Sequence, residues 1–378
     1  MLEFTDLIRT GPDTPGGQCM RRFWHPVFVA SNLRPGWAKP LKILGENLTL
    51  YRGESGTPHL LAGRCAHRGM QLSAGWIEGD CIRCRYHGFK YDATGQCVEI
   101  PMEDAAAAAT VRIRSYPTQE YLGFIFAFIG EGQPPPLPRY AEFDAEGALL
   151  WHEVYTRPCN FFNNMDNDPI HIPYAHRESE IFRHRAPEIP VQLSAEETDW
   201  GIMIQDWYAN GRLHILHLGF PNILFVKTSE GERDHLAWRV PIDDEHHWSF
   251  QVDLMHFTNE EQRRVMEERH AARSGKKGRS YIDLGEAVLR GDLRIQDIDG
   301  DDKANLIWIQ DYVTQVGQGS FADRKSEQLT RADAGVILFR KIWEREVLSL
   351  AESGRIKEWT RSSRVVGSYE NLRSWVAD

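Results

Sequence analysis

The sequence lacks the features that secreted and membrane proteins need. It has only 6 cysteines, at irregular spacing, which is too few for the disulfide framework of small secreted domains. The first residues, MLEFTDLIRTGPDTPGG, contain neither the basic nor the apolar segment of a signal peptide. No apolar run approaches the length that spans a bilayer. We therefore expect reduced thiols, a cytoplasmic protein and no membrane partner.

Positive charge is also scarce, and internal repeats are absent. The formal net charge is -10, and the basic residues are scattered among acids, which argues against a nucleic-acid partner. Hydrophobic residues make up 42% of the 378 residues, so the chain can bury a sizeable core and is long enough for two or three domains. The composition is that of an ordinary globular protein.

What the sequence does have is a dense group of thiols and imidazoles in CAHRGMQLSAGWIEGDCIRCRYHGF, residues 65–89. Cys65 and His67 form one pair, and Cys84 and His87 form a second. A structural zinc site usually groups cysteines with cysteines, whereas a Rieske 2Fe-2S cluster places two thiolates on one iron and two imidazoles on the other. The pairing favours the Rieske cluster over a zinc knuckle or a redox dithiol with Cys81.

Other residues of this segment suit a cluster. Its glycines allow tight turns whose amide groups can point toward sulfur. We expect the Tyr86 hydroxyl to be a nearby donor.

The pattern of strands and breakers predicts two domains. Short alternating or apolar runs up to YLGFIFAFIG indicate an all-β domain, and the proline-rich GEGQPPPLPRY (130–140) follows it. We place the boundary near residue 148, giving domains 1–148 and 149–378. AAAAA (105–109) is expected to be an exposed loop or a single turn.

The second domain should be of mixed type. Five strand-like runs between residues 200 and 257 predict a broad antiparallel sheet. A helix is expected after Thr258, capped by Thr258 and Glu261, and a long helix should bury one face. That face consists of Val336, Phe339, Trp343, Val347 and Leu350. The fold class is α+β.

A second metal site is indicated by NNMDNDPIHIPYAH. Pro173 should bend the chain between His171 and His176, so that both imidazoles converge. Two imidazoles and one carboxylate form the facial triad of non-heme Fe(II) oxygenases. Asp168 can cap a helix that begins at Pro169, or accept the outer ring N–H of His171 and fix its tautomer.

The third ligand must come from a distant segment. We choose Asp311, an isolated acid after the apolar run LIWI that should face inward if the segment is helical. Its competitors form an acidic stretch that more plausibly is a solvated loop: Asp297, Asp299, Asp301 and Asp302.

These residues resemble those of the catalytic α subunit of Rieske non-heme iron oxygenases, in the phthalate dioxygenase, vanillate demethylase and dicamba monooxygenase group. The resemblance runs from FWHPV through CAHRG, CRYHGF and NNMDNDPIHIPYAH to IQDYVTQVGQGSFADRKSEQLTRADAGVILFRKIW. It implies an N-terminal Rieske domain followed by a helix-grip (Bet v 1/START-like) catalytic domain with an antiparallel sheet and long helices.

The resemblance also implies roles for single residues. The cluster ligands would be Cys65, His67, Cys84 and His87, and the mononuclear Fe(II) ligands His171, His176 and Asp311. Asp168 would connect His171 to a cluster histidine of the neighbouring subunit in a homotrimer. Asn164 matches the family asparagine four residues before that aspartate, whereas Asn163 stands where many members carry glutamate.

The function that follows is a terminal oxygenase. It would take electrons from an NAD(P)H-dependent reductase or a ferredoxin and use O2 to hydroxylate, dihydroxylate or demethylate an aromatic or related hydrophobic small molecule. The sequence leaves the choice among these reactions open. A Rieske electron-transfer or redox-sensing protein is the alternative, and it would not need His171 and His176. Candidate cavity residues are Trp207, His214, Phe220 and Asn222, with His214 the first choice.

Overall fold

The computed structural model describes residues 3–168, 173–178, 189–227, 233–274 and 278–360. The chain forms two compact units, each built from more than one segment. The first unit draws on Met1–Ala145, Val240–Asp244 and Glu344–Ile356, and the second on Glu146–Arg239, Glu245–Trp343 and Lys357–Asp378. Among the described helices, none is long and apolar enough to cross a membrane.

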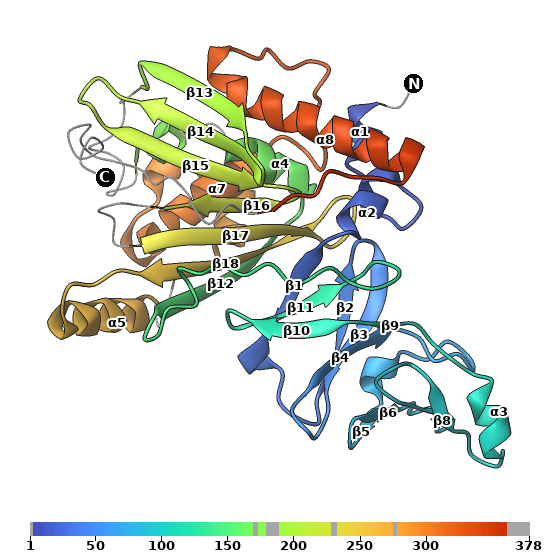
Figure 1. The fold of residues 1–378 in the computed structure, drawn as a ribbon. Coiled ribbons are helices and arrows are strands. Elements are labelled where there is room, and N and C mark those ends of the chain that lie inside the picture. Colours follow the sequence, from blue (N-terminus) through green and yellow to red (C-terminus); the bar gives the residue numbers. More distant parts are fainter. Residues whose placement is uncertain (1–2, 169–172, 179–188, 228–232, 275–277, 361–378) are drawn as a thin grey trace. The chain divides into compact units, whose positions relative to one another are not determined.

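The first unit is mostly β-structure, as the sequence predicts (Figure 1). Its strands form three sheets with the orders β1-β11-β10, β2-β3-β4-β9 and β5-β6-β7-β8. The strands are β1 (Trp24–Val29), β2 (Ala38–Ile43), β3 (Glu46–Arg52), β4 (Pro58–Ala62), β5 (Trp76–Glu78), β6 (Cys81–Arg83), β7 (Lys90–Tyr91), β8 (Cys97–Glu99), β9 (Ser115–Tyr116), β10 (Thr118–Tyr121) and β11 (Phe124–Phe128). The short helical segments are α1 (Phe4–Leu7), α2 (Pro15–Met20), η1 (Ala30–Asn32), η2 (Leu72–Ala74) and α3 (Ala105–Ala109).

Two hairpins of this unit share one turn chemistry. A Leu-Gly pair joins β2 to β3 and β10 to β11, and all four residues have positive φ, from 49° to 79°. This is the backbone that two-residue hairpin loops favour, although leucine is an unusual occupant of its first position. Leu44 and Leu122 are both buried, so packing of the side chain offsets the backbone strain.

The alanine run forms a short helix whose first turn is capped by a side chain. Residues 105–109 make one short helix, in which the Asp104 side chain accepts a hydrogen bond from the Ala107 N–H at 2.8 Å. A cap of this kind replaces the intrahelical partners that the first turn lacks.

The second unit is a seven-stranded antiparallel sheet with helices (Figure 1). The strand order is β12-β18-β17-β16-β15-β14-β13. The strands are β12 (Leu149–Arg157), β13 (Gln192–Glu197), β14 (Gly201–Trp207), β15 (Leu213–Gly219), β16 (Ile223–Val226), β17 (Arg233–Pro241) and β18 (His247–Met255). The helices are α4 (Phe161–Asn167), η3 (Pro173–His176), α5 (Glu260–Ser274), α6 (Tyr281–Leu289), η4 (Ile295–Asp297), η5 (Gly300–Asn305), α7 (Leu306–Val316), η6 (Arg331–Asp333) and α8 (Ala334–Ser353).

The predicted helical faces are largely confirmed. The five apolar positions of α8, from Val336 to Leu350, are all buried. The start of α5 differs from the prediction, because the Asn259 side chain accepts the Gln262 N–H and Thr258 bonds to the Gln262 side chain rather than to Glu261. Asparagine is an equally good cap, so the helix begins one residue later than expected.

Helices α4 and α7 lie against the same face of the sheet. Asn164 of α4 contacts His247 of β18. Trp308 of α7 packs against Tyr155 of β12 with ring centroids 5.1 Å apart. Ser249, which pairs with Tyr155, bonds to Arg239 of β17. We call this side of the sheet the helix-covered face.

Candidate metal centres

Two loops of the first unit have the same backbone pattern. The Cys65 N–H donates to the Met70 carbonyl at 2.8 Å, and the Gly69 N–H donates back to the Cys65 carbonyl at 3.0 Å. Cys84, Phe89 and Gly88 repeat these two bonds, at 2.8 Å from Cys84 to Phe89 and at 3.1 Å from Gly88 to Cys84. Gly69 and Gly88 have φ of 70° and 78°, which a larger residue rarely adopts.

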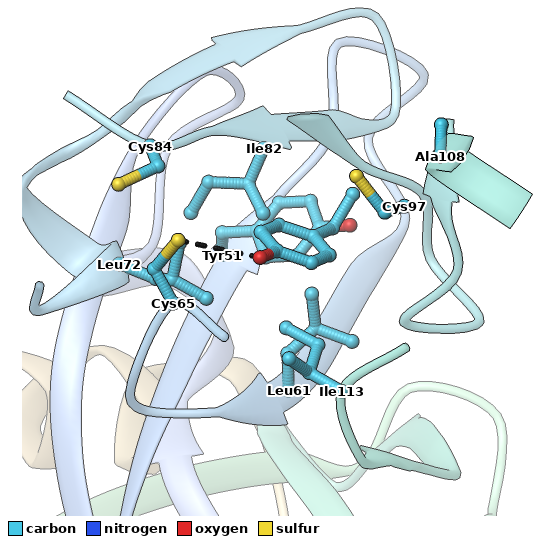
Figure 2. Close-up of a cluster of buried hydrophobic side chains, with 10 residues drawn as sticks. Tyr51, Leu61, Cys65, Leu72, Ile82, Cys84, Cys97, Ala108 and Ile113 are labelled. Carbon is cyan, nitrogen blue, oxygen red and sulfur yellow. Dashed lines mark hydrogen bonds between the residues drawn. The ribbon is translucent and has the colours of Figure 1, made fainter. Parts of the chain in front are cut away.

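The four candidate ligands separate by chemical type. Cys65 and Cys84 are buried, and Figure 2 shows their sulfur atoms on one side of the buried cluster, with that of Cys97 on the other. His67 and His87 are exposed at the loop tips, with ring centroids 4.5 Å apart. Two thiols and two neighbouring imidazoles are the donor set of a Rieske cluster, so these residues fit that group.

Hydrogen-bond donors near the two sulfur atoms offset part of the cost of burying negative charge there. Burial raises the pKa of the Cys84 thiol, and the backbone N–H groups of Tyr86 and His87 oppose that rise. The hydroxyl of Tyr91 lies 3.3 Å from the Cys65 sulfur. The Ala66 N–H donates to the same hydroxyl oxygen at 3.1 Å, which leaves the hydroxyl proton for sulfur.

Tyr86 does not have the role that the sequence suggested. Its side chain is 54% exposed, and its ring packs against that of His87 at 3.7 Å. The hydroxyl that reaches a candidate ligand sulfur is that of Tyr91, two residues after Phe89 on β7. A donor on the following strand could have been sought from the strand alternation, because the chain returns past the loop there.

In the second unit, two of the three candidate iron ligands meet. His176, at the end of η3, has its Nε2 atom 3.3 Å from Oδ1 of Asp311 on α7. Its Nδ1 atom lies 3.1 Å from the side-chain oxygen of Gln310, whose amide donates to Glu178 at 3.0 Å. Burial lowers the pKa of His176, but Asp311, Gln310 and Glu178 outweigh it and raise the pKa overall. An imidazole and a carboxylate converging in this way fit a non-heme iron centre.

His171 lies outside the described residues, and two of the four acidic competitors of Asp311 are paired with arginines. Asp297 pairs with Arg294 at 2.6 Å, and Asp302 pairs with Arg279 at 2.9 Å. Both are ion pairs of largely exposed arginines, as expected of a solvated stretch.

Asp168 ends a helix in this structure. It follows α4 as the C-cap, and its carboxylate lies 3.3 Å from the Nη2 atom of the buried Arg239. Burial raises the pKa of Asp168, and Arg239 is the first of the charges that lower it. Whether a further helix begins at Pro169 concerns residues outside those described.

Asn164 and Asn163 are both buried on α4 and have separate partners. The Asn164 amide donates to the Tyr155 hydroxyl at 3.4 Å and contacts Nε2 of His247 at 3.0 Å. Asn163 donates to the Gly319 carbonyl at 2.9 Å and accepts the Ala322 N–H at 3.2 Å. A glutamate could not donate to that carbonyl, so asparagine here is a tie between α4 and the segment after α7.

The sequence did not identify His247 as important. It follows the acidic DDE segment, yet it begins β18, is fully buried, and its Nδ1 atom bonds to the Cys159 carbonyl at 2.9 Å. Burial lowers its pKa to about 3. A neutral imidazole therefore holds Asn164 from the sheet side.

The strand register places two of the four candidate cavity residues on opposite faces of the sheet. His214 pairs with Asp206 and lies on the helix-covered face, whereas Trp207 pairs with Leu213 on the opposite face. Phe220 packs against Trp343 and Trp359, and the Asn222 amide donates to the Arg239 carbonyl. By the register through β15, β16 and β17, the His214 side chain lies on the same face as that of Arg239, which contacts Asp168.

Comparisons with known proteins bear on both centres. Residues 23–117 match the Rieske [2Fe-2S] domain family. The chain is 30% identical to the 5,5'-dehydrodivanillate O-demethylase oxygenase subunit of a Sphingobium species, covering 90% of this chain and 78% of the relative. It is 29% identical to the phenoxybenzoate dioxygenase subunit alpha of Ectopseudomonas oleovorans, covering 92% and 85%.

The fold is likewise matched in a solved structure. The terminal oxygenase of carbazole 1,9a-dioxygenase from a Novosphingobium species superposes with a TM-score of 0.67 at 18% identity, over 95% of this chain and 96% of that one. The predicted fold class is therefore confirmed. The chain belongs to the Rieske non-heme iron oxygenases, as the oxygenase subunit that carries a 2Fe-2S cluster and a mononuclear iron.

Proposed function

We propose that this Rieske oxygenase acts on an aromatic small molecule, by hydroxylation or oxidative demethylation. The relatives named above act on dehydrodivanillate and phenoxybenzoate. The helix-covered face of β14 to β16 supports a largely apolar substrate, because it presents Ile204, Leu216, Leu218 and Leu224. Asp206 and His214, 3.5 Å apart, are the polar pair on that surface.

The site residues are proposed with the following roles. Cys65, His67, Cys84 and His87 hold the cluster, and His171, His176 and Asp311 hold the mononuclear iron. When bound, these groups supply one-electron transfer and oxygen activation, respectively. Asp168 connects the two centres, and Asn164 braces α4 against His247. The observation that supports this best is the 3.3 Å contact between His176 and Asp311, two residues far apart in sequence.

The protein environment would contribute positioning. Gln310 fixes the ring orientation of His176 through Nδ1, which leaves Nε2 directed toward Asp311. Tyr91 and the loop amides stabilise charge on sulfur. The chain's own groups therefore hold donor atoms in place before any metal binds.

We also propose the assembly and the electron supply. The electron donor would be an NAD(P)H-dependent reductase, directly or through a ferredoxin, since relatives of the same fold were solved as oxygenase–ferredoxin complexes. The protein would work in the cytoplasm as a homotrimer in which Asp168 of one subunit serves the cluster of another. The domain boundary is proposed near residue 148.

The test is substrate-dependent oxygen and NADH consumption with a supplied reductase, across aryl carboxylates, aryl methyl ethers and N-methyl arenes, with product identification. We expect a hydroxylated or demethylated product from at least one aromatic class, and none from Asp311→Ala. The proposed substrate would be contradicted if the cluster is reduced but none of the aromatic compounds stimulates oxygen consumption.

A further inference from the structure

A buried arginine contacts the aspartate proposed to connect the two metal centres. Arg239 lies on β17 with a side chain only 4% exposed. Its Nη2 atom donates to Oδ2 and Oδ1 of Asp168 at 3.3 and 3.4 Å, and its Nη1 atom donates to the Ser249 hydroxyl. The guanidinium is thus held between the end of α4 and the neighbouring strand.

The backbone of Arg239 is fixed as well. Its N–H donates to the Asn222 carbonyl at 2.9 Å, and the Asn222 side-chain amide donates to the Arg239 carbonyl at 2.8 Å. Asn222 is itself buried. Because the N–H and the carbonyl of Arg239 are both hydrogen-bonded to Asn222, its backbone is fixed in the sheet. The sheet therefore determines the side from which the guanidinium approaches Asp168.

Asp168 needs such a partner for physical reasons. Its side chain is 9% exposed, and it follows the C-terminal end of α4, where the helix dipole disfavours negative charge. Asp311 adds a second negative charge in its surroundings. A carboxylate in this position is stable as an anion only if a buried cation faces it.

We propose that Arg239 is a positioning residue for the mononuclear iron centre, acting through Asp168. The contact uses one guanidinium nitrogen, so the carboxylate keeps lone pairs for the ring N–H of a neighbouring imidazole. Arg239 thereby holds the carboxylate in place, and the service of that carboxylate to His171 belongs to the proposed function on which this inference rests. Arg239 itself touches neither ligand in the described part of the site.

The same helix offers a matched control. Asp166 of α4 also has guanidinium partners, Arg324 at 2.8 Å and Arg340 at 2.7 Å. The side chains of Asp166 and Arg324 are 10% and 7% exposed, close to the values for Asp168 and Arg239. If the role of Arg239 were purely structural, replacing it would affect stability alone, as replacing Arg324 should, although Asp166 then keeps Arg340.

The experiment measures Co2+ affinity of protein that retains its cluster but has been freed of mononuclear iron, together with its melting temperature. We compare Arg239→Met, Arg239→Lys, Arg324→Met and Asp168→Asn. Arg239→Met should weaken Co2+ binding by roughly 10 to 100-fold, the usual effect of losing a group that orients a ligand. Arg239→Lys should recover part of the loss, whereas Arg324→Met should lower the melting temperature and leave Co2+ affinity unchanged. The double variant Asp168→Asn/Arg239→Met should bind Co2+ no more weakly than Asp168→Asn.

The outcomes separate this inference from the proposed role of Asp168. If Asp168→Asn weakens Co2+ binding and Arg239→Met does not, the inference is overturned and the role of Asp168 stands. If Asp168→Asn changes nothing, the role of Asp168 fails and the inference fails with it. Should Arg239→Met not fold, Arg239→Lys decides: weaker Co2+ binding at an unchanged melting temperature supports the inference, and unchanged binding overturns it.

Discussion

The cluster loops of the first unit and the iron centre of the second hold their candidate ligands by different means. In the loops, Cys65 and Cys84 are positioned by hydrogen bonds of the backbone within five residues along the chain. In the second unit, His176 and Asp311 come from η3 and α7 and are braced by side chains from other elements. The loops are thus locally encoded, whereas the iron centre depends on the packing of two helical segments that are far apart in the sequence. Mutations away from the ligands should therefore matter more in the second unit.

The largest effect is expected from removing an iron ligand. Asp311→Ala should abolish turnover and lower the iron content from about three to about two atoms per chain, with the cluster still reducible, because the two centres share no ligand. His171→Ala and His176→Ala should do the same. Iron analysis and the EPR signal of the reduced cluster measure both properties. Asp302→Ala is the control, since Asp302 pairs with Arg279. Full iron and activity in Asp311→Ala would place the third ligand elsewhere.

This difference also decides what could be predicted from sequence. The Cys65, His67, Cys84 and His87 pairs were readable because each pair and its turn glycine lie within a few residues. The strands and the buried face of α8 were readable from periodicity. The choice of Asp311 as the third iron ligand rested on the family resemblance and on its expected place on the inward face of a helix. Arg239 and His247 could not be found, because a lone arginine in a strand-like run and a histidine after an acidic turn acquire partners only when the sheet pairs.

The next effect in size concerns the aspartate itself. Asp168→Asn keeps the shape of the side chain but removes the charge that faces Arg239. We expect the cluster to remain reducible and the assembly to remain intact, while cluster reoxidation in single turnover with substrate and oxygen slows by at least roughly 10 to 100-fold. Rapid-mixing absorbance of the cluster measures this rate. Reoxidation at the unmodified rate would remove the connecting role of Asp168.

A smaller effect is expected from two fully buried histidines, one in each unit. Burial lowers the pKa of His247 to about 3 and that of His25 to about 4. Because both values lie below the ordinary 6.5, the unfolded chain binds more protons in this range, so stability is complete above pH 6.5 and is lost as pH falls through it toward pH 4. The expected loss is up to about 1.4 kcal/mol for each pKa unit per histidine.

Variants assign this acid sensitivity to a unit. His247→Gln should be less stable than the unmodified protein at pH 8, because Asn164 loses its contact with the imidazole, and should lose less stability between pH 7 and 5. His25→Gln should likewise reduce the loss of stability between pH 7 and 5, in this case through a residue of the first unit. Melting temperatures at several pH values measure it. An unchanged slope in both variants would show that other groups govern the acid response.

The smallest effect concerns a single hydrogen bond in the cluster loops. A cluster-bound Cys65 thiolate has no proton, so the Tyr91 hydroxyl would donate to it, and such a bond favours the reduced, more negative cluster. A hydrogen bond contributes about 0.5 to 1.5 kcal/mol net, so Tyr91→Phe should lower the one-electron potential by roughly 20 to 60 mV. Tyr51→Phe is a matched control, because Tyr51 lies in the same buried core but its hydroxyl donates to the Asp80 carbonyl at 2.9 Å. A mediated redox titration followed by EPR should show the shift for Tyr91→Phe only. Equal shifts in both variants would mean that general loosening of the core, and not the bond to sulfur, sets the change.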